Sequence, residues 1–251
     1  MITAAIMQPT FLPWLGDFGM MKQVDVFVFL DNVQFEKRSW QQRNRIKGPQ
    51  GPHLLTIPVI SKGRGNQHIC DVEIESNGEF QARFIETFRH FYKRAEHFAE
   101  ASALIFPLLA CQDRLLADYT MRITMEIARA LDITPKIMRG SHLGSAGRKA
   151  DLLANICSEV GAQQYVSAPG SYDYLSQSED FDRAGIAILF NTYRIEAYPQ
   201  LHGEFVSHLS VADALFCLGI QETGNLIRRS LSLTSAAEYA ASVSDVTKLK
   251  A

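Results

Sequence analysis

The densest group of polar and charged side chains lies in residues 31–47, DNVQFEKRSWQQRNRIK. Five of its side chains are basic: Lys37, Arg38, Arg43, Arg45 and Lys47. Glu36 directly precedes this group as its acidic neighbour. Basic side chains form charge-assisted hydrogen bonds with phosphate and carboxylate groups, and each bond contributes about 1.5–3 kcal/mol when it is shielded from water. The segment therefore favours a site for an anionic small molecule.

Trp40 lies among these basic residues and adds a second kind of contact. An indole beside arginines can stack on a nucleotide base or a sugar ring, which strengthens the interpretation as a binding site. Two structural alternatives remain open. The segment could be a solvated basic loop, or Arg43 and Arg45 could form buried ion pairs with Asp31 or Glu36.

Two further segments follow predicted strands and could contact the same ligand. In residues 8–18, QPTFLPWLGDF, Gln8 offers an amide, and the next helix could present backbone N–H groups to phosphate. The alternative is a hydrophobic plug that uses Phe11 and Trp14. In residues 166–171, VSAPGS, backbone amides could bind an anion, whereas a plain strand-to-helix turn is the alternative.

Several motifs that would assign a reaction are absent from the 251 residues. The chain has no GxSxG, GxxxxGK[ST] or GxGxxG motif, which removes the usual signatures of a serine hydrolase, a P-loop kinase and an NAD-dependent dehydrogenase. The seven histidines form no HExxH motif and the four cysteines form no CxxC pair, so we expect neither a metal site nor a disulfide. A net charge of −2 argues against nucleic acid as a partner.

The elements that position these segments follow from hydrophobic periodicity. Buried strands are predicted at residues 4–7 and 26–30, separated by a loop and a short crossover helix. The second half predicts strands at 135–138, 164–167 and 186–190, with helices at 148–160, 172–184 and 211–218. This alternation favours an α/β fold, with an open, mostly parallel, doubly wound sheet. Such sheets bind ligands at the carboxyl ends of their strands, where the polar segments lie.

An insertion is predicted at about residues 53–131. It contains paired strands at 53–60 and 69–75, an amphipathic helix at 77–103 and a second helix at 113–131. We expect residues 1–235 to form a single domain and residues 236–251 to form a tail that frays. The short amino-terminal apolar run lacks basic residues, and no apolar run approaches the ~20 residues that cross a bilayer. We therefore expect a cytoplasmic protein without membrane insertion.

Several of these segments together resemble the WbqC-like protein family. They are MQPTFLPWLG at residues 7–16, DVFVFLDNVQFEKRSW at 25–40, QRNRI at 42–46, YVSAPG at 165–170 and LSVADALF at 209–216. The resemblance implies a setting in bacterial O-antigen and other surface-polysaccharide gene clusters. A weaker resemblance of the strand and loop pattern to pantothenate synthetase implies a nucleotidyltransferase-like fold. Because the His-x-Gly-His signature of that group is absent, adenylyl transfer is not implied.

Together, the basic segment and the family context predict a transferase that modifies an activated sugar or amino sugar, by acylation or aminoacylation. The alternative is a non-catalytic protein that binds a nucleotide sugar or assists another enzyme; no cofactor is identified. Asp31 would be the base for a substrate ammonium, while Lys37, Arg43 and Arg45 would hold anionic groups. The predicted catalytic residues are Asp31 and Lys37, and the predicted substrate-binding residues are Gln8, Pro9, Trp14, Gln34, Trp40, Arg43, Asn44, Arg45, Ser167 and Gly170.

Overall fold

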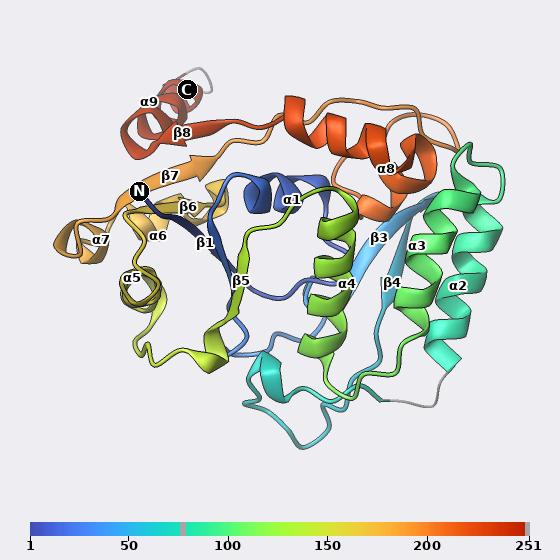
Figure 1. Cartoon of the computed structure of the whole chain (residues 1–251), viewed down its shortest axis with the longest axis horizontal. Coiled ribbons are helices and arrows are strands. Elements are labelled where there is room, and N and C mark those ends of the chain that lie inside the picture. Colours follow the sequence, from blue (N-terminus) through green and yellow to red (C-terminus); the bar gives the residue numbers. More distant parts are fainter. Residues whose placement is uncertain (76–78, 249–251) are drawn as a thin grey trace.

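A computed structural model describes residues 1–75 and 79–248. Within these residues, six strands form the main sheet in the order β5-β2-β1-β6-β7-β8 (Figure 1). Neighbouring strands are parallel, except that β8 runs antiparallel to β7. The bounds are β1 Thr3–Met7, β2 Val26–Phe29, β5 Lys136–Arg139, β6 Gln164–Ser167, β7 Ala187–Asn191 and β8 Leu233–Ser235. The predicted α/β class with a mostly parallel sheet is therefore confirmed.

Helices cover both faces of this sheet. Successive residues of a strand point to opposite faces, so each strand contributes side chains to a core on either side. Phe27 and Phe29 belong to a core that includes the helices α1 Leu15–Lys22, α4 Leu116–Ala130 and α8 Val211–Arg229. Val26 and Val28 belong to a second core with α5 Lys149–Glu159 and the short helices α6 Tyr172–Leu175 and α7 Asp180–Arg183. Among the described residues, no helix is both long and apolar enough to cross a membrane.

The predicted strand pair in the insertion has the wrong position. The hairpin consists of β3 Arg43–Gly48 and β4 Gly51–Thr56, whereas residues 59 and 74 meet only in an isolated bridge. The density of charge in residues 43–47 indicated a loop, but Asn44 and Ile46 alternate with the basic residues and are buried. This alternation of period two is the strand signal that the charges concealed.

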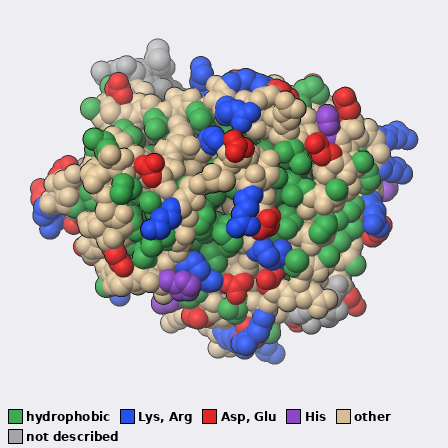
Figure 2. All heavy atoms as spheres, viewed as in Figure 1, with side chains coloured by type: hydrophobic (Ala, Val, Ile, Leu, Met, Phe, Trp, Pro, Cys, Tyr) green, Lys and Arg blue, Asp and Glu red, His purple; other side chains and the backbone are tan. Residues whose placement is uncertain are grey.

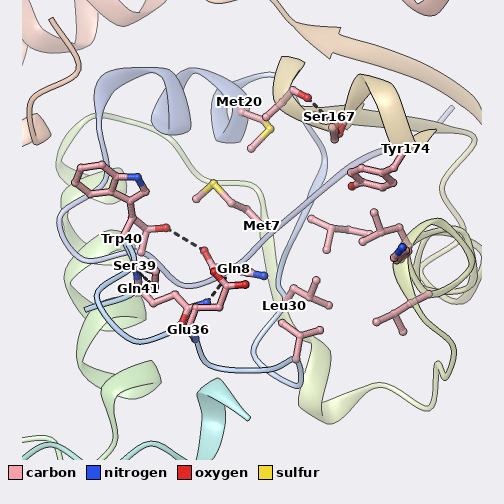
Figure 3. Close-up of a pocket in the computed structure, with 18 of the residues that line it drawn as sticks. Met7, Gln8, Met20, Leu30, Glu36, Ser39, Trp40, Gln41, Ser167 and Tyr174 are labelled. Carbon is pink, nitrogen blue, oxygen red and sulfur yellow. Dashed lines mark hydrogen bonds between the residues drawn. The ribbon is translucent and has the colours of Figure 1, made fainter. Parts of the chain in front are cut away.

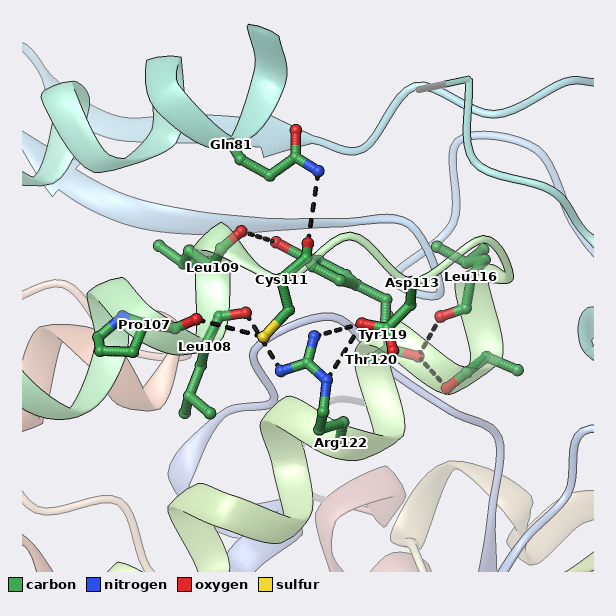
Figure 4. Close-up of polar contacts among 11 residues, drawn as sticks. Gln81, Pro107, Leu108, Leu109, Cys111, Asp113, Leu116, Tyr119, Thr120 and Arg122 are labelled. Atoms are coloured by element: carbon green, nitrogen blue, oxygen red, sulfur yellow. Dashed lines mark hydrogen bonds and ion pairs between the residues drawn. The ribbon is translucent and has the colours of Figure 1, made fainter. Parts of the chain in front are cut away.

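The helices of the insertion are also divided differently from the prediction. Residues 77–103 were predicted as one helix, but they contain α2 Glu79–Tyr92 and the start of α3 Phe98–Ala110, and the predicted start at Asn77 lies outside the described residues. The corner between α3 and α4 is held by polar contacts (Figure 4). Arg122 pairs with Asp113 and donates to the Leu108 carbonyl, and the Tyr119 hydroxyl donates to the Leu109 carbonyl over 2.8 Å.

In the second half, the predicted strands and the helix at 148–160 agree with β5, β6, β7 and α5 to within one residue at each end. The predicted helix at 172–184 is instead split into α6 and α7. The predicted helix at 211–218 continues to residue 229 as one element, α8, which bends at Gly219, where φ is +76°. Residues 236–248 of the predicted tail form helix α9 Ala236–Lys248, whose Tyr239 ring stacks on Phe190; residues 249–251 lie outside the described residues.

A buried polar cluster attaches the hairpin to the helices. Lys47 is 1% exposed, and its Nζ donates to the carbonyls of Gly203 and Glu204. Its backbone N–H donates to the Tyr92 hydroxyl over 2.8 Å, and that hydroxyl donates to Asp213 Oδ1 over 2.6 Å. Burial raises the pKa of Asp213, while hydrogen bonds from Tyr92 and other neighbours oppose the increase. Lys47 is thus a structural residue, although it lies in the dense basic segment of the sequence.

We predict that Lys47→Ala lowers the free energy of unfolding by about 2–4 kcal/mol, because it removes a buried side chain and leaves buried carbonyls without their donor. Chemical denaturation measures this loss. Lys37→Ala is the matched control, since Lys37 is exposed and its hydrogen bond to the Ser61 carbonyl, at 3.3 Å, is an exposed contact. Equal and small effects of the two substitutions would contradict the structural role of Lys47.

Candidate functional site

An open cavity of about 570 Å³ lies at the carboxyl ends of β1 and β6 (Figure 3). Gln8 directly follows β1, Ser167 is the last residue of β6, and both line the cavity. From β1, the chain continues to β2 on one side, whereas β6 lies on the other side. The cavity is therefore at the point where the strand order reverses, which is the usual ligand-binding position in open α/β sheets.

The lining of this larger cavity combines an apolar part with polar side chains. Gln41 lies beside Gln8 and donates from Nε2 to the Gln8 Oε1 over 2.8 Å. The hydroxyl of Ser167 shares a short hydrogen bond with that of Ser171. The apolar lining residues include Met7, Met20, Leu30, Val33, Leu152 and Leu153, and the polar ones include Thr10, Glu36, Ser39, Lys149 and Tyr174. This mixture suits a ligand that has both apolar and hydrogen-bonding parts.

A second cavity of about 380 Å³ adjoins the first. Met7, Thr10 and Trp40 line both cavities. The smaller cavity is completed by Trp14, Asp17, Asn44, Arg45 and His208. The structure thus brings together the loop after β1, the residues before β3 and strand β3 itself around two connected compartments.

Arg45 and Trp40 form the cationic and aromatic part of the smaller compartment. The Arg45 guanidinium lies 5.4 Å from the centroid of the Trp40 ring, and its Nη2 donates to the His208 carbonyl over 3.5 Å. The Trp40 side chain remains 49% exposed. In the part of the chain that the structure describes, the buried Nε of Arg45 has no hydrogen-bond partner. A buried donor without a partner is costly, so this nitrogen is a donor to which a ligand could bind.

Asp17 is the titratable group of this compartment, and the sequence did not single it out. It lies in the first turn of α1, where the Trp14 indole Nε1 donates to Asp17 Oδ1 over 3.0 Å. Burial raises the pKa of Asp17 to about 7, although hydrogen bonds from Trp14 oppose the increase. A carboxyl group with this pKa exchanges protons near neutral pH, as a general base must. The available sequence signal was an acid three residues after Trp14, at the start of a helix.

Gly16 makes the contact between Trp14 and Asp17 possible. A Cβ atom at residue 16 would lie 2.1 Å from Cζ2 of the Trp14 ring, so any other residue would displace the indole. The Trp14 ring also lies 4.7 Å from the ring of His208 between centroids. The start of α1 therefore accommodates the indole that holds the carboxyl group.

Asn44 lines the smaller compartment, but its side chain is engaged with the protein. Its Nδ2 donates to the carbonyls of Phe11 and Leu12 over 3.0 and 2.8 Å, and its Oδ1 accepts from the Arg45 backbone N–H. Leu12 has a φ of +45°, a conformation that non-glycine residues rarely adopt. Asn44 therefore holds the loop after β1 in place, and Pro9 is a buried part of the same loop that lines neither cavity.

Asp31, the predicted base, lies outside both cavities. Its fully buried carboxylate forms an ion pair with Arg139, at 2.7 Å from Nη2, and accepts from the Ser141 backbone N–H and hydroxyl over 2.8 Å. Ion pairing of Asp31 with Arg43 or Arg45, the alternative in the sequence, is not the arrangement observed. The partner is Arg139 on β5, which also pairs with Asp118.

The other predicted site residues also divide into those that line a cavity and those that do not. Gln8, Trp14, Trp40, Arg45 and Ser167 line the cavities, whereas Gln34, Lys37, Arg43 and Gly170 do not. Gln34 donates to the Gly65 carbonyl, and Lys37 donates to the Ser61 carbonyl. Gln8 and Ser167, at the carboxyl ends of β1 and β6, thus line a cavity, whereas Gln34, Lys37 and Gly170 are exposed outside both cavities.

A further hollow of about 510 Å³ lies between α4 and β5, on a face with many hydrophobic side chains (Figure 2). Met121, Met125 and Ile137 contribute to its lining. Its two arginines are engaged in ion pairs, Arg122 with Asp113 and Arg139 with Asp31 and Asp118. Arg45 therefore makes the smaller compartment at β1 the stronger candidate for an anionic ligand.

Comparison with known proteins agrees with the resemblance in the sequence. Residues 8–224 match the WbqC-like protein family. The uncharacterized protein Rv1507c of Mycobacterium tuberculosis is 33% identical over 219 residues, which cover 86% of this chain and 94% of that protein. No solved structure matches the chain, so the nucleotidyltransferase-like fold stays a prediction. The family match includes most of the residues that line the two compartments, and the chain belongs to the WbqC-like protein family.

Proposed function

We propose that this protein is a transferase that acylates or aminoacylates the amine of a nucleotide-activated amino sugar. The observation that carries this proposal is the position of Asp17, whose pKa is about 7, in the same compartment as the Arg45 guanidinium. A proton acceptor beside an anion-binding group suits a reaction in which an ammonium substrate must lose a proton. The polysaccharide setting implied by the family resemblance is consistent with an amino-sugar substrate.

In the proposed reaction, Asp17 takes the place that the sequence assigned to Asp31. The deprotonated carboxylate accepts a proton from the substrate ammonium, and the free amine then attacks the carbonyl carbon of an activated acyl donor. A C–N bond forms, the bond to the donor's leaving group breaks, and the leaving group departs with the bonding electrons, while the nitrogen gives up its second proton to the leaving group or to solvent. A carboxyl pKa near the working pH allows both proton uptake and release.

The binding residues follow from the same geometry. Trp40 is half-exposed at the junction of the two compartments, where its ring can stack on a base or a sugar. Arg45 provides the unpaired Nε donor and a positive charge for a phosphate or an acyl donor's anionic group. The larger compartment, at about 570 Å³, is within the volume range of small-molecule sites.

The direct test incubates the purified protein with nucleoside-diphosphate amino sugars and three donor sets: acyl-CoA, aminoacyl donors, and ATP with a free acid. Mass spectrometry should detect an amino sugar whose mass increases by one acyl or aminoacyl group. If every substrate mass stays unchanged, the transferase proposal fails. Tight binding by calorimetry without turnover would then favour the binding or accessory protein.

We predict that Asp17→Asn lowers turnover by about 10²–10⁴-fold while the substrate affinity stays similar, because the amide cannot accept the ammonium proton. For the parent protein, the rate should rise with pH and level off above about pH 7, where the carboxylate is deprotonated. Asp182→Asn is the matched control, since Asp182 is exposed on α7 and lines neither cavity. Full activity of Asp17→Asn would exclude Asp17 as the base.

The raised pKa of Asp17 also predicts a stability effect that does not depend on activity. Between about pH 4 and 7 the folded protein retains a proton that the unfolded chain has lost, so stability should fall as pH rises through this window. Asp17→Asn removes this contribution. Thermal unfolding across pH 4–8 should therefore show a weaker decline for the variant than for the parent, whereas parallel curves would contradict the raised pKa.

Arg45 and Arg43 provide a matched pair on one strand. We predict that Arg45→Ala weakens binding of a nucleoside-diphosphate amino sugar by about 1–3 kcal/mol, because the smaller compartment loses its charged donor. Arg43→Ala should change the affinity little, since Arg43 lines neither cavity. Calorimetry measures both affinities. Equal losses of affinity in the two variants would mean that the ligand responds to the overall charge of the segment and not to the position of Arg45.

A further inference from the structure

Three side chains with different metal-binding atoms meet at a short turn outside both compartments. His68 directly precedes the turn η1 Ile69–Asp71, which contains Cys70 and Asp71. One ligand atom from each of His68, Cys70 and Asp71 lies within 4.8 Å of the others. His68 and Asp71 are exposed and Cys70 is partly buried, so an ion from solvent can reach the group.

The backbone of this turn is fixed by hydrogen bonds to the segment that follows β2. The Ile69 N–H donates to the Val33 carbonyl over 3.0 Å, and the Cys70 N–H donates to the Asp31 carbonyl over 2.9 Å. The Asp71 N–H closes the turn on the His68 carbonyl over 3.0 Å. Because the backbone is held, the three side chains start from neighbouring positions, and little ordering is needed to bring them together.

The separations are compatible with one small ion. Zinc binds sulfur at about 2.3 Å and imidazole nitrogen or carboxylate oxygen at about 2.0–2.2 Å, which places tetrahedral ligand atoms about 3–4 Å apart. The three ligand atoms lie within 4.8 Å of one another, so each side chain needs to move by about one ångström to reach the tetrahedral spacing. Rotation about the side-chain bonds provides this movement.

The local charge also favours a cation. Asp71 is exposed and offers a carboxylate oxygen within 4.8 Å of the ligand atoms of His68 and Cys70. A divalent ion would be attracted by this carboxylate, and the Cys70 thiol would lose its proton to solvent as the metal–sulfur bond forms.

We propose that His68, Cys70 and Asp71 bind one divalent transition-metal ion of the zinc type, with a fourth position left to water. The combination of imidazole, thiolate and carboxylate suits zinc and cobalt, whereas magnesium and calcium prefer oxygen ligands alone. The thiolate and the carboxylate together neutralise the charge of the ion. This proposal is independent of the transfer reaction proposed above.

The sequence did not predict this site. Residues 68–71, HICD, hold three potential ligands within four positions, without the second pair of ligands that a recognised zinc motif has. Recognised zinc motifs place pairs of ligands far apart along the chain. The turn η1 instead presents all three from one short segment. Since Ile69 donates to the carbonyl of Val33, which lines the larger cavity, a bound ion would also stiffen one part of the cavity wall.

Titration of the full-length, metal-free protein with Co²⁺ tests the proposal by absorption spectroscopy. The parent should show a thiolate-to-cobalt charge-transfer band that saturates near one ion per chain, and Zn²⁺ should displace the cobalt. Cys70→Ser should remove the band. His68→Ala and Asp71→Asn should each weaken Zn²⁺ binding by at least ~10-fold in competition with a chromophoric chelator.

Cys111→Ser and His53→Ala are the matched controls. Cys111 is half-buried, His53 is exposed, and neither belongs to the proposed metal-binding group. Both should bind cobalt and zinc as the parent does. Circular dichroism confirms that each variant is folded; His68 and Asp71 are exposed, so their substitution leaves the core intact. The proposal is wrong if the parent shows no charge-transfer band, if the band persists in Cys70→Ser, or if His68→Ala and Asp71→Asn bind Zn²⁺ as tightly as the parent.

Discussion

The amide of Asn44 is the contact on which the arrangement of the site depends. By donating to the carbonyls of Phe11 and Leu12, it joins the hairpin to the loop that follows β1. The Phe11 N–H adds a bond to the Trp40 carbonyl over 3.0 Å. As a result, the loop that carries Gln8 and leads to Asp17 is held against the segment that carries Trp40 and Arg45. This connection links the loop that carries Thr10 to the segment that carries Trp40, and both of these residues line both compartments.

Charged residues that the sequence grouped together serve separate purposes in the fold. Asp31 connects β2 to β5 through Arg139 and Ser141, and Lys47 connects the hairpin to α2 and α8 through Tyr92 and its neighbours. A buried charge is tolerated only where partners replace the water that it loses. Both residues meet this requirement within the protein. Among the described residues, the buried Nε atoms of Arg43 and Arg45 both lack a hydrogen-bond partner, but Arg45 lines the smaller cavity and Arg43 lines neither.

The sequence was sufficient for features that depend on local pattern. Continuous apolar runs identified the parallel strands, and the carboxyl ends of such strands lie at one edge of the sheet. Gln8 and Ser167, which lie at these ends, line the larger cavity. Features that depend on distant partners were not predictable in this way. Arg139, the partner of Asp31, is 108 residues away in the chain. The raised pKa of Asp17 results from burial that only the packed loop produces.

The contrast between Asp31 and Asp17 explains why the carboxyl group proposed as the base is not the one that the sequence indicated. Both are aspartates near the carboxyl-end edge of the sheet, but Asp31 is enclosed by a guanidinium, a backbone N–H and a hydroxyl, and it is 0% exposed. These partners stabilise the fold and leave no approach for a substrate. Among the described residues, Trp14 is the hydrogen-bond partner of the Asp17 carboxyl group, and Asp17 lines a cavity. A carboxyl group can exchange a proton with a ligand only where its neighbours leave it both accessible and incompletely stabilised as an anion, and in this protein that condition is met at Asp17.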